Sequence, residues 1–229
     1  MKKALLLMIA TLLTSAVPAK DKFYEKPFNQ WKKGDVFKVL NDSPWAKQQT
    51  FASAVGGKGS GVGGEKELFS QYTIRFFSAR PVREAYVRMM QLMNNYDSMS
   101  KEQKAAFDVR MAKPLAMDFG DEIIVAGEFA TNDPEKRMSI DRELKQKTAE
   151  EFKQSVYLIS DRLGQVQIKA YYPPSPDGTG FKFVFPRTVD GKPLVSAEDK
   201  EVTFKWWFWD QLTISYKVKD MMHNGKLEF

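Results

Sequence analysis

The sequence predicts an α+β protein, an antiparallel and β-sandwich-like domain that carries a helical hairpin insertion at about residues 81–113. Two observations predict this fold class. Segments that alternate apolar and polar residues dominate from residue 121 onward, as expected for half-buried antiparallel strands. The strong helical patterns lie together at 81–113 and do not alternate with strands, which argues against repeated βαβ units. The alternative is a single antiparallel sheet with the helices covering one face.

Residues 1–19 have the pattern of a secretory signal peptide. Two lysines precede an apolar run, Ala4–Val17, and Ala19 provides a small residue at a cleavage site. The run is shorter than the about 17–25 residues of a transmembrane helix. We therefore expect removal of residues 1–19 and export to the periplasm or the cell exterior. Residues 20–229 would then form a single domain with no transmembrane span.

The composition excludes several kinds of chemistry. The chain has no cysteine and one histidine, His223, so thiol catalysis, disulfides and multi-histidine zinc sites are excluded. A Ser–His–acid triad would have to use His223, and no GxSxG motif occurs. Because His223 lies beside the turn Asn224-Gly225, we expect it to be solvated or to cap a backbone group. We expect no metal and no cofactor; a non-enzyme is favoured, although a catalytic carboxylate pair stays open.

The charge of the chain is mildly basic. Its 35 Lys and Arg against 29 Asp and Glu give a formal net charge of +6, with the two signs interspersed. Nucleic-acid-binding proteins concentrate basic residues in a patch or stripe. We therefore expect no nucleic-acid partner.

An N-terminal arm is expected at about residues 20–47. It begins with aromatic residues in no clear period, and a short helix is expected over Asp35–Leu40 with the aspartate as N-cap. Ser43-Pro44 repeats the pattern of a helix start. The segment Gln49–Val55 is predicted as a strand.

A glycine-rich loop, Gly56–Gly64, separates this strand from the next one, Leu68–Phe77. The loop contains the letters GxGxxG, which in dinucleotide-binding folds follow a strand and open a helix. Here a strand follows the loop, so nucleotide binding is not expected.

The helical hairpin begins at Pro81, a residue type favoured at the first helical position. Apolar residues then recur at helical spacing and are expected to form one buried stripe. These residues are Val82, Ala85, Tyr86, Met89, Met90, Met93 and Tyr96. A second helix is predicted from a capping box, Ser100 with Gln103, to about Lys113, where Pro114 would end it.

The C-terminal half is expected to contain strands joined by turns, with two short helices. Helical patterns cover Met138–Lys147 and Ala149–Gln154, and a capping box opens the second. The predicted strands are 122–131, 156–160, 165–172, 181–185 and 212–218.

The densest aromatic stretch is EVTFKWWFW, residues 201–209. In an extended strand, side chains alternate between two faces. One face would carry Val202, Phe204, Trp206 and Phe208 into the core. The other face would carry Lys205, Trp207 and Trp209, either as a second buried layer or as a surface for a ligand or partner. The buried interpretation is favoured because tryptophan is highly buried on average.

Three stretches resemble a family of uncharacterised secreted bacterial proteins. They are an SPWA turn at Ser43–Ala46, the helix start SARPVREA at Ser78–Ala85 and the tail Asp220–Phe229. The resemblance implies that residues 31–229 form one unit. The family has no known activity, so the resemblance implies no site residue.

Two functions agree with these observations. The first is an exported, non-enzymatic interaction or structural module of the cell envelope or periplasm, with an envelope protein as partner. The alternative is a carbohydrate-binding module, or a glycan-acting enzyme, that stacks sugars on Trp207 and Trp209. Rings two residues apart on one strand lie about 7 Å apart on the same face, a spacing that suits neighbouring sugar rings.

Overall fold

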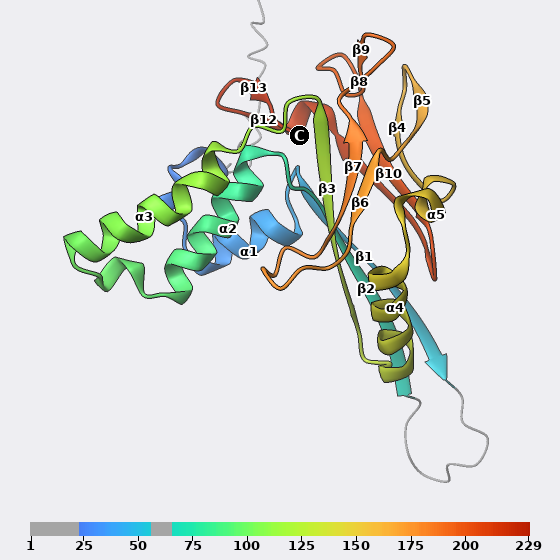
Figure 1. Cartoon of the computed structure of the whole chain (residues 1–229), viewed down its shortest axis with the longest axis horizontal. Helices are drawn as coiled ribbons and strands as arrows, with labels where there is room; N and C mark the ends of the chain where they lie inside the picture. Colours follow the sequence, from blue (N-terminus) through green and yellow to red (C-terminus); the bar gives the residue numbers. More distant parts are fainter. Residues whose placement is uncertain (1–22, 56–65) are drawn as a thin grey trace, which may run out of the picture.

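A computed structural model describes residues 23–55 and 66–229 and shows two antiparallel sheets with helices packed against them (Figure 1). The α+β class, with an antiparallel β-rich core and a helical insertion, is confirmed. The alternative of one sheet covered by helices does not form. The predicted signal peptide, 1–19, and the glycine-rich loop, 56–64, lie outside the described residues.

The larger sheet has five strands in the order β1-β2-β3-β7-β6, and every neighbouring pair is antiparallel. Its strands are β1 (Ala46–Val55), β2 (Lys66–Phe76), β3 (Glu122–Thr131), β6 (Ala170–Tyr172) and β7 (Phe181–Pro186). Because side chains alternate along β2, Tyr72, Ile74 and Phe76 face the second sheet and are fully buried. Thr73 and Arg75 point to the opposite face, under the helices.

The smaller sheet has the strand order β11-β10-β4-β5. Its strands are β4 (Val156–Ser160), β5 (Gly164–Gln167), β10 (Glu201–Trp207) and β11 (Gln211–Lys217). The predicted register of β10 is confirmed, because Val202, Phe204 and Trp206 are fully buried. The Trp206 indole lies at the centre of the core, where its ring contacts Tyr72, Phe152, Phe181, Phe183 and Phe208.

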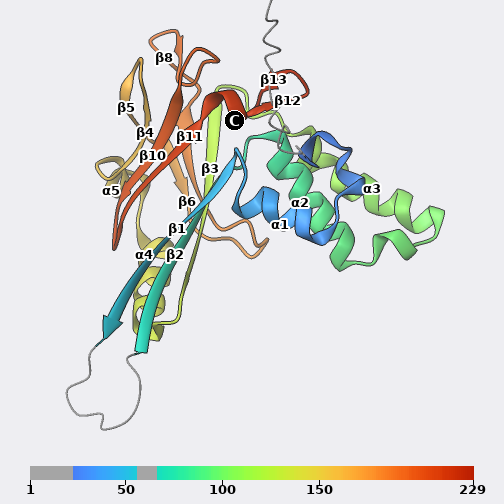
Figure 2. The ribbon, with the colours of Figure 1, turned by 180° about the vertical axis from the view of Figure 1, so that it is seen from behind.

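The two sheets are connected along both edges. The chain leaves β5 in the smaller sheet and enters β6 in the larger one after two residues. The predicted continuous strand 165–172 is therefore wrong, because the chain bends and changes sheets, as strands do at sandwich corners. At the other edge, the backbone N–H of Thr213 in β11 donates to Gln49 Oε1 of β1 at 3.1 Å (Figure 2).

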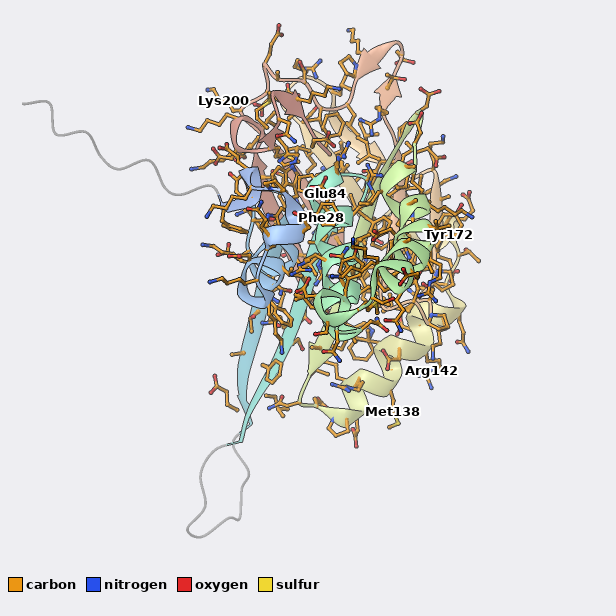
Figure 3. All side chains as sticks on the ribbon, turned by 90° about the vertical axis from the view of Figure 1, so that its left-hand side faces the viewer. Phe28, Glu84, Met138, Arg142, Tyr172 and Lys200 are labelled. Atoms are coloured by element: carbon orange, nitrogen blue, oxygen red, sulfur yellow. The ribbon has the colours of Figure 1, made fainter. Side chains whose placement is uncertain are left out.

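The helices α1 and α2 lie at the outer face of the larger sheet, and α3 packs on α2 further out, as Figures 1 and 3 show. They span Lys33–Asn41, Arg80–Met93 and Lys101–Ala116. Arg75 of β2 connects the sheet to them, because its buried guanidinium donates to the Leu40 carbonyl of α1 and, at 3.2 Å, to Tyr86 Oη of α2. Glu128 of β3 neutralises this cation at 2.7 Å. Burial raises the pKa of Tyr86 to about 12, so the phenol stays a neutral partner.

The helix α3 continues through Pro114 to Ala116, so the prediction that Pro114 ends it is wrong. Its capping box at Ser100 is confirmed. Arg83 of α2 binds the end of α3, since its Nη1 donates to the carbonyl oxygens of three residues. They are Pro114, Leu115 and Met117, at 3.1, 2.9 and 3.0 Å. Carbonyls in the last turn have no helical donor, and this cation satisfies them.

Two local predictions near the N-terminus are wrong. Ser43-Pro44 starts no helix; Ser43 forms a bridge with Ala46, where β1 begins. Asp35 is not the N-cap of α1 but lies one turn inside, where its carboxylate accepts from the backbone N–H of Lys32 at 2.9 Å. In both cases the capping residue type is present, but the helix begins elsewhere or not at all.

The methionine stripe of α2 is only partly buried. Val82 and Ala85 are fully buried, whereas Met90 and Met93 are 39% and 71% exposed. The C-terminal half of α2 extends beyond the sheet with α3 (Figure 1). Those methionines therefore have no second layer to pack against, and the prediction of one buried stripe is wrong for them.

Two further helices, α4 (Pro134–Gln146) and α5 (Ala149–Lys153), confirm the helical patterns of the C-terminal half. Asp133 caps α4 by accepting from the backbone N–H groups of Glu135 and Lys136. The remaining elements are small. They are the hairpins β8–β9 (Thr188–Val189, Lys192–Pro193) and β12–β13 (Met222–His223, Lys226–Leu227), and four 3-10 turns at Phe23–Glu25, Phe28–Gln30, Tyr96–Ser98 and Val218–Asp220.

Candidate functional site

The outward face of the smaller sheet carries aromatic and polar side chains, among them Lys205. Strand pairing places Tyr157 of β4 beside Lys205 of β10, and Trp207 lies one pleat further along the same face. We call this region the Trp207 surface. It consists of Tyr157, Gln167, Lys205, Trp207, Gln211 and Thr213, which the pairings of β5, β4, β10 and β11 bring together.

The geometry of the Trp207 surface is that of an aromatic corner. Trp207 is 40% exposed, whereas the preceding Trp206 is fully buried. The Tyr157 ring meets Trp207 edge-on, with centroids 6.1 Å apart and planes inclined by 71°. Lys205 Nζ lies 4.7 Å from the Trp207 centroid, a cation–π contact of modest strength at an exposed site. The surface combines a large apolar ring, a cation and amide groups.

Trp209 does not belong to this surface. β10 ends at Trp207, and the chain turns, so the rings do not share the face of one strand. Trp209 Nε1 instead donates to Glu143 Oε1 of α4 at 3.1 Å. Lys147, the residue that follows this helix, lies over the Phe208 ring. The β10–β11 turn is therefore attached to α4, and Trp209 is part of that attachment.

The expectation that Trp207 and Trp209 are both buried under helices is also wrong. Their exposed fractions are 40% and 45%. The helices α1–α3 cover the larger sheet and leave the outward face of the smaller one open (Figure 1). Strand alternation places Trp207 correctly on the outward face, but it gives no information on which sheet the helices cover.

A cleft of about 190 Å³ lies where the space between the sheets opens at one end. Its floor is formed by residues of β1 and β2 in the larger sheet, including Phe51, Leu68 and Ser70. Its polar wall is formed by Asp133 and Lys136 of α4 and by Asp210 of the β10–β11 turn. We call this the Asp210 cleft. No pattern along the sequence predicts this cleft, because its walls come from four separate parts of the chain.

A buried phenol lies beneath the Asp210 cleft. Tyr72 Oη donates to Asp210 Oδ2 at 2.9 Å, and Lys136 Nζ donates to the same oxygen at 2.8 Å. Burial, and then the hydrogen bond to Asp210, raise the pKa of Tyr72 far above its ordinary value. Tyr72 is therefore a neutral hydrogen-bond donor at physiological pH, and it fixes the Asp210 carboxylate against the sheet.

His223 is buried, in contrast to the expectation of a solvated or capping side chain. It is 4% exposed, and its ring meets Trp45 edge-on at 6.0 Å. Nε2 lies 3.7 Å from Glu84 Oε2 and 3.0 Å from Asn224 Nδ2, and the described residues provide no hydrogen bond to Nδ1. No serine of the described chain hydrogen-bonds this ring, so the arrangement is not that of a nucleophilic triad.

The three stretches singled out in the sequence meet around His223. Trp45 of the first stretch donates from Nε1 to the carbonyls of Met221 and Glu228 in the tail, at 3.3 and 2.9 Å. The Glu228 carboxylate accepts from the backbone N–H of Arg80, at the start of α2, at 3.0 Å. These contacts join residues up to 183 positions apart in the sequence. These hydrogen bonds hold the C-terminal hairpin β12–β13 against the N-terminal end of α2.

A metal centre is not indicated in the described part of the chain. Residues 23–55 and 66–229 contain no group of three or more His, Cys, Asp or Glu side chains that could hold a metal ion. Within the same residues, no helix has the length and apolar character needed to cross a membrane.

The sequence matches no protein-family model and no curated protein. A crystal structure of a protein of unknown function from Burkholderia pseudomallei is similar over 63% of this chain and 72% of that chain, with 11% identity and a TM-score of 0.41.

Proposed function

We propose that this protein is an exported, non-enzymatic interaction module of the cell envelope and that it contacts a protein partner through the Trp207 surface. The observation that carries the proposal is the 40% exposure of Trp207 beside Tyr157 and Lys205. Aromatic residues are enriched at protein interfaces, and tryptophan and tyrosine at their hot spots. An indole left exposed on the outward face of a sheet is therefore a natural anchor for a partner.

A protein partner suits this surface better than a glycan. Stacking of successive sugars needs neighbouring rings that share a plane, whereas Tyr157 meets Trp207 edge-on and Trp209 is attached to α4. Lys205 already lies over one face of the Trp207 indole. The glutamine and threonine side chains around this corner offer donors and acceptors for a polar interface rim.

Site-specific photo-cross-linking in the native host tests the proposed contact. A photoreactive residue at position 205 should give a discrete protein adduct, and the same residue at Val109, which is 76% exposed on α3, should not. Adding Trp207→Ala should remove the adduct formed from position 205. No adduct at 205, or an adduct that Trp207→Ala leaves unchanged, would contradict the proposal. Loss of a glycan-array signal in Trp207→Ala, with no protein adduct, would assign the surface to a sugar.

The export step rests on the pattern of residues 1–19 and has its own test. N-terminal sequencing of the protein from the cell envelope or medium should find Lys20 as the first residue. Retention of Met1–Ala19 in a membrane-bound product would contradict export with cleavage.

A further inference from the structure

The Asp210 cleft contains oxygen atoms that the described chain leaves without partners. Both hydrogen bonds to Asp210 end on Oδ2, and both bonds to Asp133 end on Oδ1. The second oxygen of each carboxylate accepts no hydrogen bond from the residues described. Ser70 on the cleft floor is 4% exposed, and its hydroxyl likewise has no described partner. None of these oxygens is among the fully buried unpaired atoms of the described residues, so they are open to the cleft. Together they can accept hydrogen bonds from a ligand with several donors.

The one cation among the residues that line the cleft, Lys136, is paired with Asp210, to which its Nζ donates at 2.8 Å. Asp133 has no ion pair within the described residues, so the lining keeps one uncompensated negative charge. An anionic ligand would meet this carboxylate at close range. A ligand of positive charge meets oxygens that have lone pairs to offer.

The rest of the cleft is apolar. Phe51 and Leu68 on the floor, and Phe69 at its rim, provide hydrocarbon and ring surface next to the carboxylates. A primary ammonium carries three N–H donors and no acceptor. A short alkyl stem behind it would lie against these apolar side chains, as lysine stems do on protein surfaces.

We propose that the Asp210 cleft binds a primary alkylammonium group, with Asp133, Asp210 and Ser70 accepting its three hydrogen bonds. The group comes either from a lysine side chain of a peptide or from a small free amine. This site is separate from the Trp207 surface, and neither proposal depends on the other.

Titration of the folded full chain with n-butylammonium, followed by amide NMR shifts of Ser70, Thr131 and Asp210, tests the binding. We expect saturable shifts that cluster at the cleft. Butyltrimethylammonium, which keeps the charge but has no N–H donor, and valerate, an anion of similar length, should bind at least tenfold more weakly. No saturable shift with n-butylammonium, or equal binding of any control, would overturn the proposal.

A matched pair of variants separates the site from general charge effects. Asp133→Asn should weaken n-butylammonium binding at least tenfold and keep α4 intact, because asparagine caps helices as well as aspartate does. Asp141→Asn, which removes an exposed charge on the same helix, should bind as the unmodified protein does. Unchanged affinity in Asp133→Asn would overturn the proposal, as would equal losses in both variants.

Comparison of a second ligand with n-butylammonium distinguishes the two possible sources of the ammonium group. N-acetyl-lysine amide binding more tightly than n-butylammonium would identify a peptide lysine, and the reverse order would identify a small amine. Either order supports the cleft as an ammonium site. Ser70→Ala should weaken both ligands, since it removes one of the three accepting oxygens.

Discussion

At the scale of single residues, two adjacent tryptophans have opposite environments. Trp206 is fully buried against the rings of Phe181 and Phe183 in the larger sheet, while Trp207 is 40% exposed on the outward face. The difference follows from strand alternation, which sends neighbouring side chains to opposite faces. Buried Trp206 should therefore determine stability, and Trp207 should determine binding.

Replacing these two residues with alanine should give very different stabilities. Trp206→Ala removes the ring at the centre of the core and should lower the free energy of unfolding by about 3–5 kcal/mol. Trp207→Ala should cost about 1 kcal/mol or less, as surface substitutions do. Urea midpoints of both variants measure this difference. Equal losses would mean that Trp207 is covered, and a stable Trp206→Ala would mean that the register of β10 is wrong.

Gly127 is a residue whose lack of a side chain the core requires. A Cβ at this position of β3 would lie 2.2 Å from Cζ of Phe181, its cross-strand partner on β7. Gly127→Ala must push a buried ring and should cost about 1–3 kcal/mol. Gly34→Ala is the control, because nothing lies within 4 Å of its Cβ. That control should be neutral or stabilising by up to about 1 kcal/mol, and equal effects in thermal unfolding would contradict the argument.

At the scale of elements, α3 depends on a contact from another helix. Along its 16 residues, Phe107 is the one buried side chain, so packing contributes little to it. Arg83 supplies what packing does not, by binding the carbonyls at the C-terminal end. A positive charge at a helix C-terminus also interacts favourably with the helix dipole. Burial lowers the pKa of Arg83, but the pKa of an arginine is so high that its guanidinium stays charged at neutral pH.

Removing this cation should loosen the end of α3 without unfolding the sheets. Arg83→Gln should accelerate amide hydrogen exchange over about residues 110–117, since the last carbonyls lose their donor. Arg110→Gln, on the exposed side of α3, serves as the control and should leave exchange there nearly unchanged. Uniform acceleration across β2 and β3 in Arg83→Gln would show a global effect and contradict a local role.

At the scale of the whole molecule, two loops are held by hydrogen bonds to aspartate side chains, Asp177 and Asp199, whose carboxylates must stay ionised. Burial raises the pKa of Asp177, but hydrogen bonds from Ser175 and Thr179 outweigh it and lower this pKa to about 2. The hydrogen bond from Arg162, partly offset by burial, lowers the pKa of Asp199. A carboxyl with a lowered folded-state pKa adds stability above its unfolded pKa of about 3.9. That contribution is lost as the pH falls through the folded pKa.

The protein should therefore lose stability as the pH falls from about 4 toward 2. Asp199→Asn should be less stable than the unmodified protein at pH 6 and should show a weaker pH dependence in this window. Free energies of unfolding from urea titrations at pH 6, 4 and 3 measure both effects. A pH dependence identical in the two proteins would exclude Asp199 as a contributor.

Local sequence patterns determined much of this structure. The strand Glu122–Thr131, the capping boxes at Ser100 and Thr148 and the inward face of β10 follow from alternation and capping. These features depend on neighbours within a few residues, and the sequence contains all of those neighbours. Where a local pattern failed, another contact competed with it: at Pro114 a distant one from Arg83, and at Ser43-Pro44 the nearby bridge between Ser43 and Ala46.

The tertiary structure alone decided which surfaces stay open and which distant residues meet. His223 is buried because Trp45 and Glu84 lie against it, and Trp209 leaves the sheet face because Glu143 of α4 binds it. The Asp210 cleft likewise exists because the first turn of α4, the β10–β11 turn and residues 51–52 and 68–70 of β1 and β2 meet at one place. Burial and hydrogen-bond partners depend on segments that are far apart in the chain, so periodicity along the sequence carries no record of them.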